Sequence, residues 1–185
     1  MLIEIKDRYT DEIIISGEYN NLIECLEKNK AKLKNANLRG MRLSGGDFMF
    51  ANFDGADLRD TQMRATDLRQ AHANGCNLSG ADCRDSNWGG VSLWGARIVN
   101  AVFRDMGLGD AVLQDADCRG TDFTRSYCHG TNFKGASLKL AGLFKADCKD
   151  ANFYRARMQD TNCEGTDFTG ANLKGTLLEK EKGDK

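Results

Sequence analysis

The sequence predicts an all-β solenoid, in which the chain coils around a narrow core filled by its own side chains. Three observations lead to this prediction. Residues 36–175 divide into 28 consecutive pentapeptides without an insertion or deletion. The third place of each pentapeptide is apolar, with Leu at 11 and Phe at 7 of the 28 positions. The fifth place is Gly, Asp or Asn in 21 of 28 pentapeptides, and these residues tolerate turns with a positive φ.

Neither a helix nor a flat strand fits this spacing. Five residues on a helix advance the side chain by roughly 140° net, so successive third places would spiral around the axis. In an unbroken strand, an odd spacing would send them to opposite faces. The chain must therefore bend once per pentapeptide in a constant sense. The small first place, which is Ala in 15 of 28 pentapeptides, is expected to point inward beside the large third place.

Residues 1–30 do not follow the repeat and are predicted to form a small α+β N-terminal cap. Residues 2–8 and 12–16 are typical of a β-hairpin, and a helix is expected over about residues 20–30. Asn21 and Glu24 have the spacing of a capping box at its start. The first coil of a solenoid exposes strand edges and an apolar core, so we expect this cap to cover that end, together with Met49 and Phe50.

The repeat domain is predicted over residues 31–178, and residues 179–185 form a charged C-terminal tail without an apolar residue. The sequence indicates no second cap. Two alternatives remain for this end. The tail shields the last coil with its charges, or two molecules pair there as a homodimer through the C-terminal coil.

The pattern resembles the pentapeptide repeat family. It is carried by units such as Ala-Asp-Leu-Arg-Asp at residues 56–60 and Ala-Asn-Leu-Lys-Gly at 171–175. The resemblance implies a right-handed quadrilateral parallel β-helix with four pentapeptides per coil. The 28 pentapeptides would then make about seven coils, with residues 20 apart stacked on one another.

Composition and motifs favour a protein without catalysis, cofactor or metal. No nucleophile, metal or phosphate-loop motif was found, and His72 and His129 fall at outward places. Five of the seven cysteines occupy third places and are expected in the core. Cys128 and Cys148 would stack within disulfide reach, and the sequence does not decide whether they ever form a disulfide. The N-terminus has no signal-peptide pattern and no stretch would span a membrane, so a cytoplasmic protein is expected.

Function is expected to lie in the outward second, fourth and fifth places. Our first hypothesis is a rigid scaffold for a protein partner of unknown identity, with exposed apolar residues as its contact. The candidates are Leu140, Phe144 and Trp94, and Val99, Val102 and Val112 also fall at outward places.

The alternative comes from the family resemblance, which implies proteins that imitate DNA and bind DNA gyrase. The candidate acidic face is Asp47, Asp67, Asp147 and Asp167, interrupted at Asn87, Gly107 and Tyr127. A candidate basic ladder, Arg64, Arg84 and Arg104, is expected to be neutralised by Asp85 and Asp105. The chain has 26 basic and 27 acidic residues, so direct binding to nucleic acid is not expected.

Overall fold

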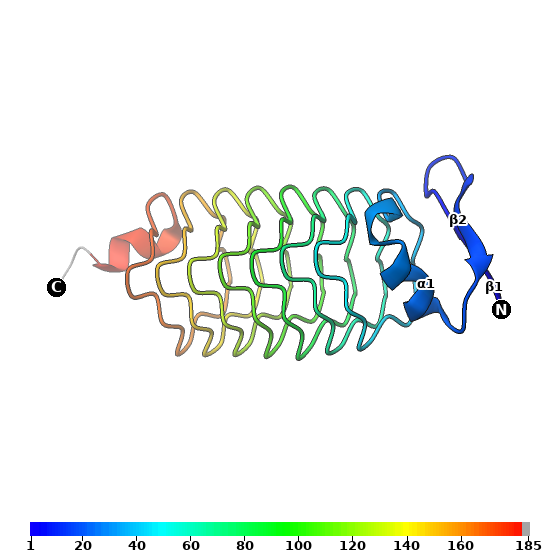
Figure 1. Ribbon diagram of the computed structural model, residues 1–185. Helices are drawn as coiled ribbons and strands as arrows, with labels where there is room; N and C mark the ends of the chain where they lie inside the picture. The colour runs from blue at the N-terminus through cyan, green and yellow to red at the C-terminus, as the bar shows by residue number, and fades with distance from the viewer. Residues whose placement is uncertain (183–185) are drawn as a thin grey trace.

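The computed structural model describes residues 1–182, which form a rod of stacked coils with a small cap at the N-terminal end (Figure 1). The cap contains the strands β1 (Leu2–Lys6) and β2 (Ile13–Glu18), the helix α1 (Leu22–Lys28) and the short 3-10 helix η1 (Lys30–Lys32). A second 3-10 helix, η2 (Leu177–Lys182), follows the last coil. The predicted β-helix solenoid is confirmed.

The coils are joined by parallel bridges between residues 20 positions apart, from Asn37 with Asp57 to Asn152 with Asn172. Each coil therefore takes four pentapeptides. The bridging residue is always the second place of its pentapeptide. Each pentapeptide contributes a single bridging residue, and the chain bends at the next corner.

Backbone hydrogen bonds link each coil to both neighbours. The Asp57 N–H donates to the carbonyl of Ala36 in the preceding coil at 2.9 Å, and the Leu58 N–H donates to Asn77 in the following coil at 2.8 Å. The fourth place donates to a side chain: the Arg59 N–H lies 3.2 Å from Asp57 Oδ1. An Asp or Asn side chain at the second place thus accepts the hydrogen bond of the fourth-place N–H, which has no carbonyl acceptor in the neighbouring coils.

The corners fall at the fifth places, as the sequence predicts. All 28 of these residues have φ between +53° and +79°. Most are Gly, Asp or Asn, but Phe50 and Leu140 adopt the same conformation, at +59° and +61°. A side chain at such a corner points away from the rod. Phe50 is accordingly 66% exposed, so the expectation that the cap covers it is wrong.

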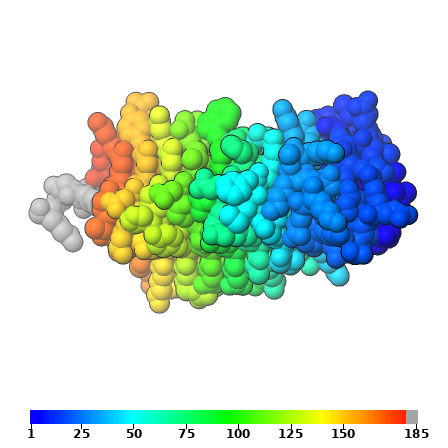
Figure 2. All heavy atoms as spheres, in the orientation of Figure 1, coloured from blue at the N-terminus to red at the C-terminus, as the bar shows by residue number. Residues whose placement is uncertain are grey.

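The core is the column of third places. Of the 28 third-place residues, 26 are buried, and the two exceptions, Cys163 and Phe168, are half-buried in the last coil. Phenyl rings stack along the axis, as in Phe133 and Phe153, whose centroids are 4.8 Å apart. On the face drawn in Figure 2, side chains close the gaps that Figure 1 shows between the coils.

The cap satisfies the edge of the first coil. β1 and β2 pair antiparallel, and the Asn21 side chain accepts a hydrogen bond from the Glu24 N–H at the start of α1. Two N–H groups of the first coil then donate to cap carbonyls, Asn37 to Lys6 at 2.8 Å and Asn52 to Lys30 at 2.9 Å. The cap therefore provides acceptors for these two N–H groups, and the Glu27 carboxylate accepts from a third, that of Asp47, at 2.8 Å.

The C-terminal end is partly covered by η2, which follows the last coil directly (Figure 1). The Gly175 N–H donates to the Glu179 carboxylate at 2.7 Å, and Leu178 packs against the core. Within residues 1–182, however, the N–H groups of Met158 and Phe168 have no coil carbonyl to donate to. Residues 183–185 of the predicted tail lie outside the described residues.

Candidate interaction surfaces

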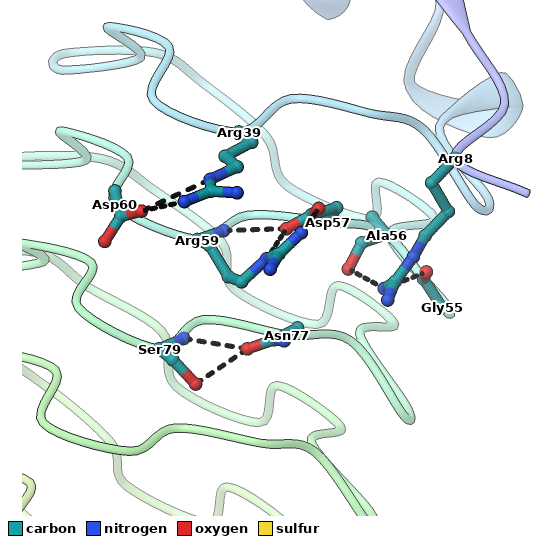
Figure 3. A network of polar contacts seen from close by, with 9 residues as sticks. All are labelled: Arg8, Arg39, Gly55, Ala56, Asp57, Arg59, Asp60, Asn77 and Ser79. Carbon is teal, nitrogen blue, oxygen red and sulfur yellow. Dashed lines mark hydrogen bonds and ion pairs between the residues drawn. The ribbon is translucent and has the colours of Figure 1, made fainter. Parts of the chain in front are cut away.

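The recurring motif of this surface is an ion pair between an Asp at the second place and an Arg two residues later. Both side chains point outward from one pentapeptide, as Asp57 and Arg59 do in Figure 3. Arg59 Nε lies 2.8 Å from Asp57 Oδ1, and Arg59 Nη2 lies 2.5 Å from Oδ2. The Arg59 hydrogen bonds hold the pKa of the Asp57 carboxyl below its usual value although burial raises it.

The same spacing produces the same pair elsewhere on the rod. Asp67 with Arg69 (2.6 Å), Asp82 with Arg84 (2.8 Å), Asp117 with Arg119 (2.7 Å) and Asp147 with Lys149 (3.6 Å) repeat it. The Asp oxygen that accepts the fourth-place N–H is held beside the fourth-place side chain. A pentapeptide with Asp at the second place and Arg or Lys at the fourth therefore pairs its two opposite charges and has no net charge from them.

The structure brings the acidic candidates into one column. Asp47 bridges Asp67, and Asp147 bridges Asp167, with the expected interruption at Asn87, Gly107 and Tyr127 between the two pairs.

Each of these carboxylates has a basic partner. Lys30 lies 2.9 Å from Asp47, Arg69 lies 2.6 Å from Asp67, and Lys149 lies 3.6 Å from Asp147 and 3.3 Å from Asp167. Hydrogen bonds from the Thr169 hydroxyl and N–H lower the pKa of Asp167 to about 2, and Lys149 adds to the effect. The negative charge of the acidic column is therefore compensated by neighbouring Lys and Arg side chains.

The basic ladder stacks as expected, but its partners differ from the prediction. Arg64 and Arg84 both bind Asp82, at 2.7 and 2.8 Å, and Arg104 lies 3.6 Å from Asp122. Asp105, an expected partner, instead pairs with Arg125 at 2.7 Å. Asp85 forms no ion pair within residues 1–182. A corner position does not by itself prevent pairing, because the corner residue Asp60 binds Arg39 at 3.3 Å. The arginines of the ladder pair instead with the second-place carboxylates of Asp82 and Asp122.

The apolar candidates divide into two groups. Trp94 and Leu140 protrude, with 55% and 63% of their surface exposed. Phe144 is only half-buried, and the Lys145 ammonium lies 4.9 Å from its ring centroid. Leu140 closes a corner while Phe144 belongs to the next face, so sequence proximity does not make them one patch. The outward valines, Val99, Val102 and Val112, are half-buried because neighbouring coils cover their sides.

One face carries charges that the sequence analysis did not single out. We call it the Leu58 face; its third places are residues 38, 58, 78, 98, 118, 138 and 158. The pentapeptides 36–40, 56–60 and 76–80 form its paired half, where Arg59 binds Asp57 and Arg39 lies 3.3 Å from Asp60 (Figure 3). The pentapeptides 96–100, 116–120, 136–140 and 156–160 form its cationic half.

Two adjoining hollows lie along the cationic half. One, of about 400 Å³, is lined by Arg97, Val99, Arg119, Lys139 and Leu140, among others. The other, of about 320 Å³, shares Arg119 and extends to Ser137 and Arg157. The sequence could have revealed this surface. In three of the four pentapeptides of the cationic half, Arg or Ser stands at the second place instead of Asp, so the basic side chains there lack the carboxylate that would pair with them.

The cysteines pack as core residues. Cys128 and Cys148 are buried thiols, and contact with the Cys128 thiol, followed by burial, raises the pKa of Cys148 strongly. Burial raises the pKa of Cys76 to about 12. Both effects disfavour the thiolate that nucleophilic chemistry requires. Within residues 1–182, no cluster of three or more His, Cys, Asp or Glu side chains is placed to hold a metal ion.

The repeat matches the family model for pentapeptide repeats in 8 copies, over residues 31–70, 76–106, 108–139 and 146–180. The chain belongs to the pentapeptide repeat family. None of the curated proteins matches the sequence. Among the described residues, none of the helices has the length and apolar character needed to cross a bilayer.

Solved structures resemble the chain at low identity. A pentapeptide repeat protein from the cyanobacterium Cyanothece is 26% identical, with 60% of this chain and 63% of that chain covered and a TM-score of 0.31. One from the thylakoid lumen of Arabidopsis thaliana is 26% identical, with 78% and 73% covered and a TM-score of 0.36. QnrB1, a plasmid-mediated fluoroquinolone resistance protein, is 17% identical, with 76% and 71% covered and a TM-score of 0.41.

Proposed function

We propose that this pentapeptide repeat protein is a non-catalytic scaffold that presents a rigid surface to a protein partner. The observation that carries the proposal is the combination of a filled core with large apolar side chains fixed at corners. The third-place side chains fill the core along the described coils. Leu140 is held outward by a backbone that hydrogen-bonds to the next coil, at 3.0 Å from its N–H to the Gln159 carbonyl.

Rigidity supports a role in recognition. A surface whose backbone is bonded to coils on both sides loses little conformational freedom when a partner docks. Trp94 is suited to anchor such a contact, because Trp is among the residues that most often carry the binding energy at protein interfaces. Leu140 adds exposed apolar surface beside the cationic side chains.

DNA mimicry directed at gyrase is the second candidate, and the charge pairing favours it less. A DNA groove selects a continuous polyanion. The acidic column is broken for three coils, and each of its four carboxylates lies within 3.6 Å of a basic group. Inhibition or drug protection of gyrase by micromolar protein in a supercoiling assay would reverse this ranking.

Quantitative capture from a cell lysate tests the scaffold proposal. The informative variant is Leu140→Asp, and Phe50→Asp is its matched control, because Phe50 is also an exposed fifth-place apolar residue with the same backbone conformation. We expect Leu140→Asp to lose proteins that the wild type and Phe50→Asp retain. An identical set of captured proteins for all three would contradict a contact at Leu140.

The C-terminal coil is a second contact in this proposal, where two copies pair as a homodimer. Two observations support it: the N–H groups of Met158 and Phe168 have no acceptor among the described residues 1–182, and Leu177 is 60% exposed. Sedimentation equilibrium at micromolar protein is expected to give the mass of a dimer, and Leu177→Asp is expected to shift it toward the monomer. A monomeric wild type would remove the dimer.

A further inference from the structure

The cationic half of the Leu58 face has more positive charge than its own carboxylates neutralise. Its outward places carry four basic side chains, Arg97, Arg119, Lys139 and Arg157, against the two acids Asp117 and Asp160. Arg119 already occupies Asp117, with Nε 2.7 Å from Oδ1. Arg97, Lys139 and Arg157 form no ion pair within residues 1–182. All three are exposed. Arg97 also helps to lower the pKa of Asp117 in the next coil, after the larger effect of Arg119. The side chains of all three remain accessible to a ligand.

The coil geometry arranges these charges as a strip along the rod. Arg97, Asp117, Ser137 and Arg157 form one column of bridges, so the two outer arginines are three coils, or about 14 Å, apart. Arg119 and Lys139 occupy fourth places of the two coils between them. An extended polypeptide of about four or five residues has the length of this strip. The half-buried Ser137 lies between Asp117 and Arg157 and adds a hydroxyl donor.

Apolar side chains line the same strip. The half-buried Val99 and the exposed Leu140 border the larger hollow together with Arg97 and Lys139. Neither hollow has an aromatic lining residue, whereas surfaces that hold single-stranded nucleic acid use aromatic rings to stack the bases. Apolar groups beside cations instead suit a peptide that alternates carboxylates with aliphatic side chains.

We infer that the cationic half of the Leu58 face binds an acidic polypeptide segment, with carboxylates on Arg97, Lys139 and Arg157 and an aliphatic side chain between Val99 and Leu140. This inference deepens the proposed scaffold function and rests on it. The Asp115 carboxylate also lines the smaller hollow, where the Gln114 amide donates to it at 3.2 Å. We therefore place the ligand carboxylates along the cations and not at the Asp115 corner.

Fluorescence anisotropy with a defined probe tests the inference. The probe is a fluorescein-labelled peptide of alternating Glu and Leu, and the control peptide has Gln in place of Glu. We expect saturable binding of the Glu peptide that weakens as salt is raised. The triple variant Arg97→Gln/Lys139→Gln/Arg157→Gln should bind at least about tenfold more weakly, equivalent to about 1.4 kcal/mol.

The matched control is Arg64→Gln/Arg84→Gln/Arg104→Gln, which removes the same net charge from the paired basic ladder. It should change the affinity by no more than about twofold, because only screened long-range attraction is lost. Equal weakening of both triple variants would overturn the inference, as would equal affinity for the Gln peptide. Tighter binding of oligothymidylate than of the Glu peptide would overturn it in favour of nucleic acid. Circular dichroism melting checks that each variant is folded.

The two proposals can fail separately. If Leu140→Asp loses captured proteins while the peptide binds no better than its Gln control, the scaffold function stands and the acidic ligand is wrong. If the peptide binds as expected but Leu140→Asp captures the same proteins as the wild type, the contact proposed at Leu140 for cellular partners is wrong.

Discussion

The two halves of the Leu58 face share one backbone and differ in charge. In the paired half, Arg59 and Arg39 bind Asp57 and Asp60, and the polar contacts continue in Asn77 with Ser79 (Figure 3). In the cationic half, only Arg119 has such a partner among the described residues 1–182. The second place accounts for much of the difference, because Asp57 is replaced there by Arg97, Ser137 or Arg157. Arg39 follows Asn37 and is paired instead by the corner residue Asp60, so a carboxylate at the fifth place can also neutralise a coil.

The largest expected effect tests whether the halves share the same core. Leu78 and Leu138 are third-place residues with no exposed surface, one in the paired half and the other midway along the cationic half. We expect Leu78→Ala and Leu138→Ala each to lower the free energy of unfolding by about 3 kcal/mol, because each leaves a cavity in a packed column. Urea unfolding followed by circular dichroism measures both. A loss confined to one variant would show that the halves differ in more than surface charge.

A smaller effect is expected from the paired charge itself. Asp57→Ala removes both the Arg59 partner and the acceptor of the Arg59 N–H, so we expect a loss of about 2 kcal/mol. At the same place in the cationic half, Ser137→Ala should stay within about 0.5 kcal/mol of the wild type. Asp57→Asn keeps the N–H acceptor and should recover part of the loss. Equal losses for Asp57→Ala and Ser137→Ala in the same urea experiment would contradict the comparison.

Acid titration should weaken the paired half in a defined direction. The pKa of Asp57 is lower in the folded protein than in the unfolded chain, chiefly because of the Arg59 hydrogen bonds. Its contribution to stability is therefore complete above the unfolded value of about 3.9 and is lost as the pH falls through the folded pKa. The loss should be smaller than for Asp57→Ala, because a protonated carboxyl still accepts the N–H bond.

Urea unfolding at a series of pH values below neutrality measures this dependence. Asp57→Asn should have a shallower fall in stability below about pH 4 than the wild type. Asp167, whose pKa is lowered to about 2, should extend the wild-type fall toward that pH. An unchanged slope in Asp57→Asn would show that the pair does not couple to folding.

The smallest expected effect transfers the pairing rule to the cationic half. Ser137→Asp places a carboxylate two residues before Lys139, as Asp147 precedes Lys149. We expect a gain of about 0.5 kcal/mol at neutral pH, since an exposed pair contributes little, and weaker binding of the Glu and Leu peptide. Ser137→Asn, which adds the acceptor without charge, is the control. Unchanged peptide binding in Ser137→Asp would argue against Lys139 as a ligand contact.

The fold was predictable because the repeat encodes it locally. An apolar third place and a turn-forming fifth place recur with a period that only a regularly bent chain can bury, so the core and the corners followed from the sequence. The column of Asp47 and Asp67 was predictable for the same reason, once residues 20 apart were taken to stack. The extent of the cap elements was less predictable: α1 (Leu22–Lys28) lies within the predicted helix, with Asn21 as its N-cap and Asn29 as its C-cap.

The sequence by itself determined which residues face inward and which stack, since both depend on a strict period. Only the tertiary structure decided which charges meet. Arg84 pairs with Asp82 of its own pentapeptide, which also accepts its N–H, and not with the adjacent corner residue Asp85. The packing of Leu178 in η2 against the core likewise depends on tertiary contacts that no repeat pattern specifies.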